Sequence, residues 1–419
     1  MKTLNYRHIL KTKFILFFAF VLLNPGISIS QVLPLDSVLA RIEANNPALL
    51  SYVNKINSSR ELVKGARAYP APSAGVMFDD NPYSFRYGSR MIDFSVSQSF
   101  PNRKALNAKE NYLNSLSEIP AQESGQLKNE LFAQAKIHYF ERYISESKIR
   151  VLHENSALMK SMIDISERQM ASGMGDLGSI YKMKARLSDT EAMLVHEENV
   201  LKTKTSELNY LMASDLNQAF ARDTHNLLKD YRGKLLPATS EILELRRSDI
   251  RRMNNEITSM KLNRILMSTM SKPEMTLSGK HYLLSGQADL FAAEAMVMIP
   301  IAPWSAKGYK SKVKAMGFDI EAMQQEKQAL LNAAAKEVNM FALELNAEYS
   351  EVEKYEQDVI PAYKKSFDAN LLAYSQNTGD LMKVILALDD LQMAQMEYLR
   401  HFGTLLKAQA EYEREMQIR

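Results

Sequence analysis

The chain has no cysteine among its 419 residues. This absence excludes disulfides, thiolate metal sites and cysteine nucleophiles, and also the lipid-modified cysteine that begins a mature bacterial lipoprotein. Turn-forming residues are scarce, because the chain has only 13 prolines and 15 glycines. That scarcity favours long uninterrupted elements over many short ones. No run of 18 consecutive apolar residues is present, so the sequence predicts no transmembrane helix.

Enzymatic motifs are also missing. The segment around Gly173 and Gly175 follows a predicted helix and lacks the lysine of a phosphate-binding loop, and no GxSxG nucleophile motif occurs. The seven histidines include no pair four residues apart and no HExxH. We therefore predict a protein that is not an enzyme, with no catalytic residue, no cofactor and no metal site.

Methionine, in contrast, is abundant, with 24 residues. Met253, Met260 and Met267 are spaced by seven, and Met296 and Met298 share one face of a predicted strand. Thioethers can bind soft Cu(I), but they more often fill irregular seams between helices. We favour packing as the interpretation, with copper binding as the alternative.

The N-terminal segment has the pattern of a signal peptide. Four basic residues lie near the N-terminus: Lys2, Arg7, Lys11 and Lys13. They precede an apolar run at 14–23, which is too short to span a bilayer and is followed by Pro25 and Gly26. Small residues at Ser28 and Ser30 predict cleavage before Gln31, and an anchor that stays attached is the alternative. The chain has 52 basic and 49 acidic residues, four of the basic ones in 1–30, so the mature charge is 48 − 49 = −1. A charge near zero argues against nucleic acid as a partner.

An internal repeat organises the rest of the chain. Gly175-Asp176-Leu177 recurs as Gly379-Asp380-Leu381, and Phe100-Pro101 and Ala302-Pro303 both precede long helical patterns. Two predicted helix starts, at 37–50 and 240–253, are separated by nearly the same number of residues as these pairs of motifs. We therefore predict a first repeat at 31–213, a connector at 214–238 and a second repeat at 239–419.

Each repeat is predicted to run helix, strand, strand, very long helix, tight turn, long helix. In the first repeat, Asp36 or Ser37 can cap a helix that ends near Ala68. After this helix we expect a strand at 73–78, a loop at 79–89 and a strand at 92–100. In the second repeat we expect a helix at 239–268, a strand from Pro273, a loop at 284–288 and a strand at 293–301.

The helices after the strands are unusually long. Residues 304–374 contain a single proline, Pro361, and about 70 helical residues would span roughly 105 Å. The matching segment at 102–171 contains Pro120 and Gly125, where we expect a kink or break. Each long helix is followed by a returning helix with apolar residues at coiled-coil spacings, so the two should pack side by side. These residues are Leu187, Leu194, Leu201 and Leu208 in the first repeat, and Leu381, Val384, Leu388, Leu391, Ala394, Tyr398, Phe402, Leu405, Ala408 and Tyr412 in the second.

The strand at 92–100 alternates most clearly. Its apolar residues are Ile92, Phe94, Val96 and Phe100, and its polar residues are Asp93, Ser95, Ser97 and Ser99. Four strands are too few to close a barrel, whereas three chains would supply twelve. In such an assembly the apolar face would meet lipid and the polar face would line the lumen. The alternative is a small soluble sheet with one buried face.

The order of these features resembles the TolC family of outer-membrane efflux proteins. The similar stretches are Leu35-Asp36-Ser37-Val38-Leu39, Asn45-Asn46-Pro47, Ser99-Phe100-Pro101, Ile299-Pro300-Ile301 with Trp304, Pro361, Tyr374, and Gly379-Asp380-Leu381 with a closing helix to Tyr412. The resemblance covers residues 32–415, and its specificity lies in the order of short motifs. The metal-efflux branch of the CusC and CzcC type is similar in its short length and in the run from Pro300 to Lys310.

The resemblance implies a fold that is mainly α with a small β part. Long coiled-coil helical hairpins would form a trimeric α-barrel, and four strands per chain would contribute to a 12-stranded trimeric transmembrane β-barrel. It implies an outer-membrane channel with a large periplasmic portion, passively conducting substrates from an inner-membrane pump, of the RND type, through a periplasmic adaptor. The rival hypothesis is a non-conducting periplasmic or surface coiled-coil scaffold.

The resemblance also implies roles for the two helical turns. The tips that would dock the adaptor are Gly173, Gly175, Asp176 and Leu177 in the first turn and Gly379, Asp380 and Leu381 in the second. Asp380 and Lys383 are candidate gate residues, although Lys383 and Leu386 stand where the family archetype has acidic rings. A purely structural role as helix caps is expected of Asp176 and Asp380 in any case.

Overall fold

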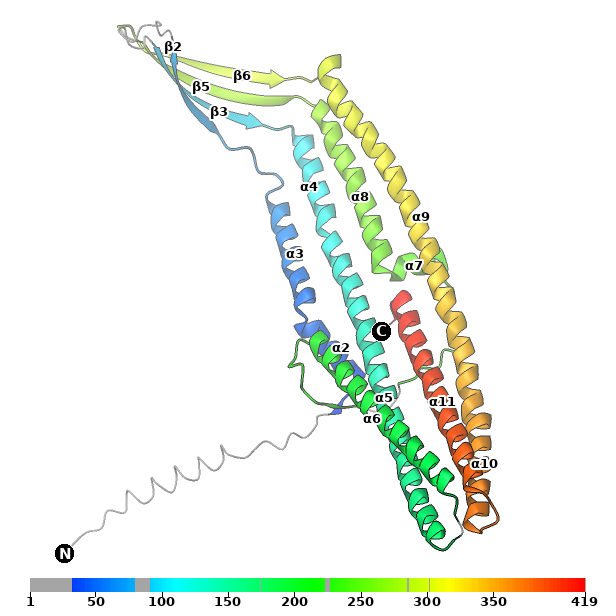
Figure 1. Cartoon of the computed structure of the whole chain (residues 1–419). Helices are drawn as coiled ribbons and strands as arrows, with labels where there is room; N and C mark the ends of the chain where they lie inside the picture. The colour runs from blue at the N-terminus through cyan, green and yellow to red at the C-terminus, as the bar shows by residue number, and fades with distance from the viewer. Residues whose placement is uncertain are drawn as a thin grey trace, which may run out of the picture.

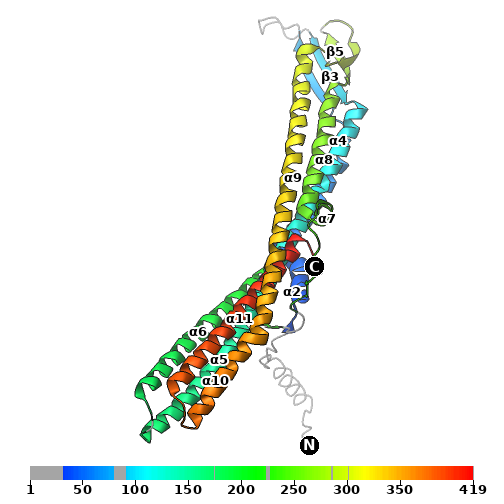
Figure 2. The same cartoon turned by 90° about the vertical axis from the view of Figure 1, so that its right-hand side faces the viewer.

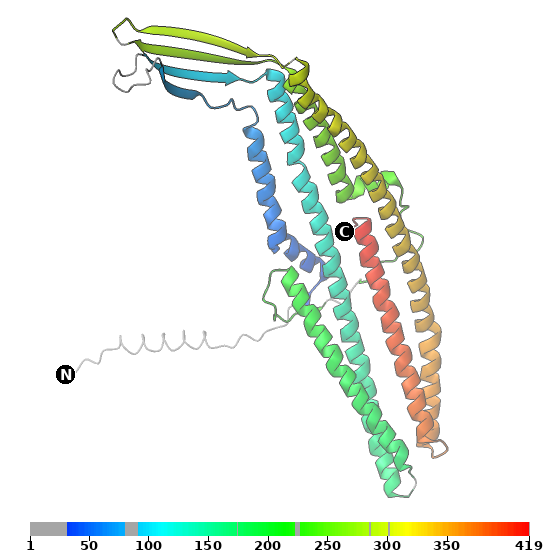
Figure 3. The same cartoon turned by 45° about the horizontal axis from the view of Figure 1, so that its top comes forward.

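The computed structural model describes residues 32–79, 91–173, 175–222, 227–284, 286–300 and 302–418. The expected signal peptide and nearly all of the expected loop at 79–89 lie outside these residues. The molecule is elongated, with a sheet at one end and two helical turns at the other (Figures 1, 2 and 3). Among the described residues, none of the helices is long and apolar enough to cross a membrane.

The sheet has four antiparallel strands in the order β2-β3-β5-β6. Its members are β2 (Ser73–Asp79), β3 (Met91–Phe100), β5 (Glu274–Leu284) and β6 (Leu290–Met298). Both repeats supply two adjacent strands, and the pairing of β3 with β5 joins them. The predicted strands are confirmed, but β6 starts three residues earlier than expected and ends at Met298, before Pro300, because a proline cannot donate to the ladder.

Four helices continue from the four strands in the same lateral order. They are α3 (Pro47–Lys64), α4 (Arg103–Ser117), α8 (Ser248–Ser268, extended by the 3₁₀ turn η2, Thr269–Ser271) and α9 (Pro303–Lys354). Neighbours in this order pack side by side, so the helices form one curved layer beneath the sheet (Figure 1). Asn102 begins α4 as predicted, because its side chain accepts a hydrogen bond from the Lys104 amide at 2.9 Å.

The lower half consists of two helical hairpins. The first is α5 (Ile119–Ala171) with α6 (Leu177–Leu211), and the second is α10 (Ile360–Ser375) with α11 (Leu381–Glu415). In this layer α11 packs between α5 and the continuous α9–α10 rod, while α6 packs mainly on α5 (Figure 2). The predicted seams are confirmed, since the apolar positions of both returning helices are buried or partly buried.

Short elements join the two halves. These are β1 (Val32–Leu33), which pairs in parallel with β4 (Ala221–Arg222), the helix α2 (Leu35–Asn45) and the helix α7 (Ser240–Arg246). They cover the middle of α5 and α11, where two of the three apolar cores lie. The third core fills the space between the hairpins near the turns.

The helix that opens each repeat is broken, which the sequence analysis did not predict. The cap expected at Asp36 or Ser37 is wrong, because the first helix begins at Leu35, directly after Pro34, and no side chain caps it. The helix expected to end near Ala68 divides at Asn46, whose extended backbone (ψ 119°) follows from the proline after it. The Asn46 side chain then caps α3 by accepting from the Ala48 amide. In the second repeat Arg247 has the same extended conformation (ψ 122°) and separates α7 from α8.

The first long helix breaks where proline requires it. The chain leaves α4 at Glu118 and enters α5 with Pro120 at its first turn, which confirms the proposed break. Gly125, however, lies inside regular helix, so the expected kink there is wrong. A side chain at Gly125 would approach Ser248 Oγ to 2.8 Å, so this glycine allows α5 to lie against the start of α8.

The second long helix is not uniform either. A π-helical segment, η3 (Tyr355–Val359), connects α9 to α10 just before Pro361. Proline has no amide to donate, and a π-bulge accommodates the missing bond without ending the helix. Both long helices therefore depart from a regular α-helix next to a proline. The long helix of the first repeat is broken at Glu118, whereas that of the second repeat continues through a π-helical segment.

Candidate functional site

One face of the sheet is mainly apolar across all four strands, with Gln98 and His281 as its polar residues on β3 and β5. The register places Val76 beside Phe94 and Ile92 beside Leu283, and Met275 beside Val297. Several of these side chains are exposed in the single chain, including Phe94 at 43% and Val96 at 59%. The four residues predicted to face lipid, Ile92, Phe94, Val96 and Phe100, all belong to this face. A continuous exposed apolar surface of this kind requires a partner, either lipid or protein.

The opposite face is polar. Asp93, Ser95, Ser97 and Ser99, predicted to line the lumen, lie on it together with residues of β5 and β6. Cross-strand contacts connect them: Ser73 Oγ lies 2.7 Å from Ser97 Oγ, Ser99 Oγ lies 3.1 Å from Thr276 Oγ1, and Lys280 Nζ lies 3.7 Å from Glu294 Oε2. Met296 and Met298 also belong to this face and are exposed. The period-two pattern of β3 therefore continues on β5, where Thr276, Ser278 and Lys280 share the polar face, whereas β6 contributes only Glu294 as a charged or polar side chain to that face.

Both edges of the sheet are open. In the described part of the chain, β2 pairs only with β3, and β6 pairs only with β5. Each edge strand therefore presents a row of backbone donors and acceptors without a partner strand. Such an edge is a template for pairing with another chain.

The first helical turn is built on two glycines and an aspartate. Gly173 has φ +78°, the left-handed conformation that favours glycine after a helix. A Cβ on Gly175 would lie 2.8 Å from the Met170 backbone, so only glycine fits. Asp176 accepts from the amides of Gly178 and Ser179 and begins α6. The hydroxyl and amide of Ser179 hold the pKa of Asp176 below its usual range.

The second turn repeats this geometry with one change. Asn377 takes the place of Gly173, with φ 55°, because asparagine tolerates the left-handed region better than most residues. A Cβ on Gly379 would lie 2.9 Å from the Tyr374 amide nitrogen. Asp380 accepts from the Met382 amide at 3.1 Å and begins α11. The predicted helix caps are therefore confirmed in both turns.

The two turns lie together at one end of the molecule, but their leucines differ (Figure 1). Leu177 is 47% exposed, whereas Leu381 is 6% exposed and belongs to the core between the hairpins. Asp380 and Lys383, the candidate gate residues, are both exposed. The surface that this end offers to a partner therefore comes from Leu177 and the exposed polar residues rather than from Leu381.

Polar contacts that no sequence pattern indicated bridge the two hairpins near the turns. Ser166 Oγ lies 2.8 Å from Tyr374 Oη, and Gln169 Nε2 donates to Asn377 Oδ1 at 3.2 Å. Farther from the turns, Arg186 Nη2 of α6 lies 3.0 Å from Asp389 Oδ2 of α11. Burial raises the pKa of Asp389 despite this arginine.

A histidine and two glutamates meet on the first hairpin. His138 Nδ1 lies 2.9 Å from Glu207 Oε2 and 3.4 Å from Glu141 Oε2, a grouping that the absence of histidine motifs did not reveal. Lys204 Nζ lies 3.1 Å from Glu141 and 2.9 Å from Glu207. The lysine already supplies positive charge to both carboxylates, so the arrangement is a charge cluster that needs no metal ion. The hydrogen bond from His138 lowers the pKa of Glu141.

The methionines of α8 lie along a helix seam. Met253, Met260 and Met267 are all partly buried, as expected of side chains that fill gaps between helices. The packing interpretation of these methionines therefore has a structural basis.

Buried ion pairs join the two repeats at mid-length. Lys136 of α5 pairs with Glu413 of α11, and both side chains are almost fully buried. Tyr231 Oη donates to Glu413 at 2.7 Å. Burial opposes ionisation of Glu413, but Lys136, Tyr231 and Lys229 together outweigh it and lower its pKa.

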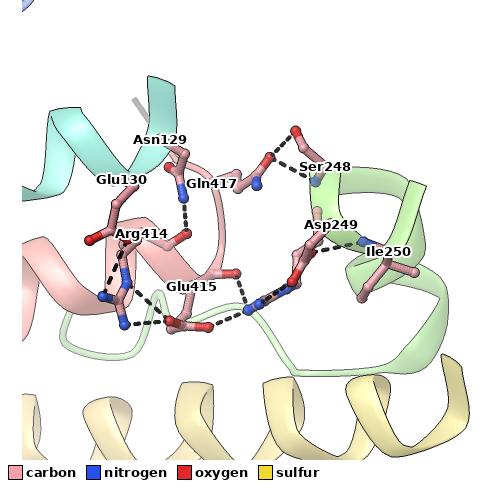
Figure 4. A network of polar contacts seen from close by, with 9 residues as sticks. Asn129, Glu130, Ser248, Asp249, Ile250, Arg414, Glu415 and Gln417 are labelled. Atoms are coloured by element: carbon pink, nitrogen blue, oxygen red, sulfur yellow. Dashed lines mark hydrogen bonds and ion pairs between the residues drawn. The ribbon is translucent and has the colours of Figure 1, made fainter. Parts of the chain in front are cut away.

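A second network lies close by (Figure 4). Arg247, in the break between α7 and α8, pairs with Glu415 of α11 and with Asp249 at 2.8 Å. Arg414 pairs with the other oxygen of Glu415 at 2.8 Å. Gln417 Oε1 accepts from the Ser248 amide at 3.1 Å and from its hydroxyl at 2.9 Å, which caps the start of α8. The end of α11 therefore fixes the geometry of the second broken helix.

No protein-family model and no curated protein sequence matches the chain. Solved structures do match. The outer-membrane channel OprN has a TM-score of 0.76 at 14% identity over 91% of this chain and 89% of that one. CusC, described with the conformational changes that accompany folding and transmembrane channel formation, has a TM-score of 0.77 at 13% identity over 91% of each chain. The outer membrane protein VceC from Vibrio cholerae has a TM-score of 0.74 at 14% identity over 91% of this chain and 95% of that one.

These likenesses establish the fold. The chain has the architecture of outer-membrane channels, which is the fold implied by the resemblance to the TolC family.

Proposed function

We propose that the protein is the outer-membrane channel of a tripartite efflux system. Three copies would form a closed ring, with a 12-stranded barrel in the outer membrane and a helical tunnel in the periplasm. The tunnel would conduct substrates passively, while an inner-membrane pump supplies the energy. The observation that carries the proposal is the two-faced sheet with two open edges, in a chain whose fold matches known channels.

The open edges support closure of a ring. Edge β6 of one copy and edge β2 of the next are different surfaces, and a contact between different surfaces generates rings when the rotation closes. Open edges and unpaired backbone groups cannot remain in lipid, because each costs several kcal/mol. Three copies of four strands give twelve strands, a number that closes around water.

The helices show the same two open sides. On α3, at one side of the upper layer, Leu50, Val53 and Leu62 are 46%, 53% and 64% exposed. On α9, at the other side, Met340 and Leu343 are 46% and 72% exposed. In a ring, α9 of one copy would face α3 of the next, and both apolar surfaces would be covered.

We propose further that the turns meet a periplasmic adaptor, with an RND-type inner-membrane pump beyond it. The turns lie at the end of the molecule farthest from the sheet, which is where a partner below the outer membrane would reach the channel (Figure 3). A photo-crosslinking residue in place of the exposed Leu177 should capture the adaptor. The same residue at Val195, also exposed but farther up α6, should not.

Neighbouring residues of β3 test the membrane assignment. Val96→Lys places a charge on the apolar face, and Ser97→Lys places the same charge on the polar face. A lysine facing mid-bilayer lipid costs about 2–4 kcal/mol, whereas a lumen-facing lysine costs little. Fractionation and native mass measurement should therefore find outer-membrane trimers for the wild type and Ser97→Lys, and far fewer for Val96→Lys.

Two results would count against the proposal. Equal trimer yields for the two variants would contradict the assignment of the faces. A wild-type chain found entirely in the soluble periplasmic fraction, as an elongated oligomer, would support the scaffold instead.

A further inference from the structure

A cavity of about 270 Å³ lies where the two repeats meet. Its wall is formed by α5, the end of α7, the start of α8 and the end of α11. Four residues of this wall are labelled in Figure 4: Asn129 of α5, Ser248 of α8, Arg414 of α11 and Gln417 in the turn that follows α11. The cavity lies apart from the sheet and from the turns, so the proposed channel function does not use it.

The charged residues that line this cavity all carry positive charge. They are Lys128, Lys136, Arg246, Arg251 and Arg414, and the lining contains no aspartate or glutamate. They come from four different elements, so the clustering is a product of the fold and not of a basic run in the sequence. Lys136 and Ser248 are 5% and 2% exposed, which makes part of the wall rigid.

Three of the five cations are already paired with acids behind the cavity wall. Lys128 pairs with Glu43, and Lys136 pairs with Glu413. Arg414 lies 2.8 Å from Glu415, its nearest acid. These pairs fix the side chains in place and leave them with little uncompensated charge.

The remaining two cations are arginines without an acidic partner. Within the described residues, neither Arg246 nor Arg251 makes an ion pair, although Arg251 Nη2 donates to Ser248 Oγ at 3.1 Å. Guanidinium groups have several donors in a planar fork, which matches two oxygens of a phosphate. Two exposed guanidiniums without an acidic partner, at the edge of a cavity whose other cations are held in place, therefore form a site suited to a doubly charged oxyanion.

We propose that this cavity binds a phosphate dianion, with Arg246 and Arg251 as its principal ligands. The volume is several times the roughly 30 Å³ that a water molecule occupies in the liquid, so the cavity has room for a phosphate and for a small group attached to it. Inorganic phosphate and a sugar phosphate share the recognised chemistry. Occupation would connect α7 and α8 of the second repeat to α5 of the first.

Isothermal titration of the purified full chain tests the proposal, with inorganic phosphate and glucose 6-phosphate as separate probes. Sodium chloride at matched ionic strength and glucose are the blanks. Binding of inorganic phosphate alone or of both probes supports the site, and tighter binding of glucose 6-phosphate indicates that the room beside the phosphate is used.

Matched variants locate the site. Arg251→Gln removes a proposed ligand, and Arg264→Gln removes the same charge farther along α8, outside the cavity. We expect at least tenfold weaker phosphate binding for Arg251→Gln and for Arg246→Gln, and unchanged binding for Arg264→Gln. The variants keep Lys136 and Glu413, so the buried pair that joins the repeats remains intact.

Three outcomes would overturn the proposal. One is the absence of heat with either probe at millimolar concentration, and another is equal affinity in wild type and Arg251→Gln. The third is loss of assembled trimer in Arg246→Gln or Arg251→Gln without any phosphate binding by the wild type, which would identify the arginines as a contact between subunits.

Discussion

The two returning helices α6 and α11 have the same length, the same Gly-Asp-Leu start and different surroundings. Each has 35 residues, of which 9 are buried in α6 and 16 in α11. The difference follows from position, because α11 lies between α5 and the α9–α10 rod while α6 packs mainly on α5 (Figure 2). Duplicated segments can therefore keep their caps and lengths while only one of them becomes a central core element.

The outer position of α6 leaves apolar side chains exposed. Tyr181, Val195 and Tyr210 are 61%, 59% and 72% exposed. In the proposed ring these residues would lie where the next copy of the chain approaches. The contrast between the hairpins is thus one between a helix stabilised within the chain and a helix that depends on assembly.

The largest effect is expected from the buried pair that joins the repeats. Lys136→Met leaves Glu413 buried without its closest cation, although Lys229 and Tyr231 remain near it. Removing one partner of a buried pair costs about 3–5 kcal/mol, and we expect a loss of this size in chemical unfolding. The double variant Lys136→Met with Glu413→Gln should recover part of it. A Lys136→Met protein as stable as wild type would contradict the role of the pair.

The same pair predicts an acid dependence. The pKa of Glu413 in the folded protein lies below its ordinary value of 4.5. A lowered pKa contributes stability that is complete above the unfolded value and is lost as the pH falls through the folded one. Wild-type stability should therefore fall below about pH 4.5 more steeply than that of Glu413→Gln. If the unfolding free energies of wild type and Glu413→Gln changed equally with pH, the Glu413 carboxylate would not cause the loss of stability in acid.

Equivalent leucines of the two returning helices test their unequal burial. Leu187 of α6 and Leu391 of α11 occupy matching positions, but only Leu391 is fully buried, at 6% exposure. Leu391→Ala should cost about 3 kcal/mol, and Leu187→Ala about 1 kcal/mol because less apolar surface is lost. Thermal or chemical unfolding measures both. Equal losses of unfolding free energy in the two variants would show that α6 is packed as well as α11.

The turns should respond alike where their geometry is shared and differently where it is not. Gly175→Ala and Gly379→Ala both force a Cβ against backbone and should each cost about 2 kcal/mol. Gly173→Asn should be nearly neutral, because Asn377 already holds the same conformation in the other turn. Gly173→Ala, with positive φ but free space, should cost about 1 kcal/mol. A Gly173→Asn loss as large as that of Gly175→Ala would contradict this equivalence.

A small effect is expected at the bridge between the hairpins. Arg186→Gln leaves Asp389 partly buried without its nearest cation and should cost about 1 kcal/mol. Asp389→Asn removes a carboxylate whose pKa is already raised by burial, so it should cost less than Arg186→Gln or stabilise slightly. Because a raised carboxyl pKa disfavours the charged form, the penalty of Arg186→Gln should shrink as the pH falls through that pKa. If the stability lost in Arg186→Gln did not change with pH, the uncompensated charge of Asp389 would not be its cause.

Sequence patterns predicted the elements whose causes are local. Alternation identified β3, and the glycine and aspartate of each turn identified the caps, because strand period and capping depend on a few adjacent residues. The break at Asn46 also had a local signal, the proline that follows it, which a single-helix prediction overlooked.

Other features depend on residues far apart in the chain. Arg247 carries no local helix-breaking signal, and its partner Glu415 lies 168 residues away. The same holds for Lys136 and Glu413, which are separated by 277 residues. The sequence shows these charges but not their proximity, so the junction and its cavity required the fold.

In the proposed assembly, several copies of this chain enclose a water-filled path. Single-channel recording of the purified oligomer in a planar bilayer measures that path. A trimer should give discrete, reproducible conductance steps. Ser97→Lys, whose new charge would face the lumen, should change the ion selectivity. A trimer that inserts into the bilayer without conducting, or a Ser97→Lys protein with unchanged selectivity, would contradict the proposed assembly.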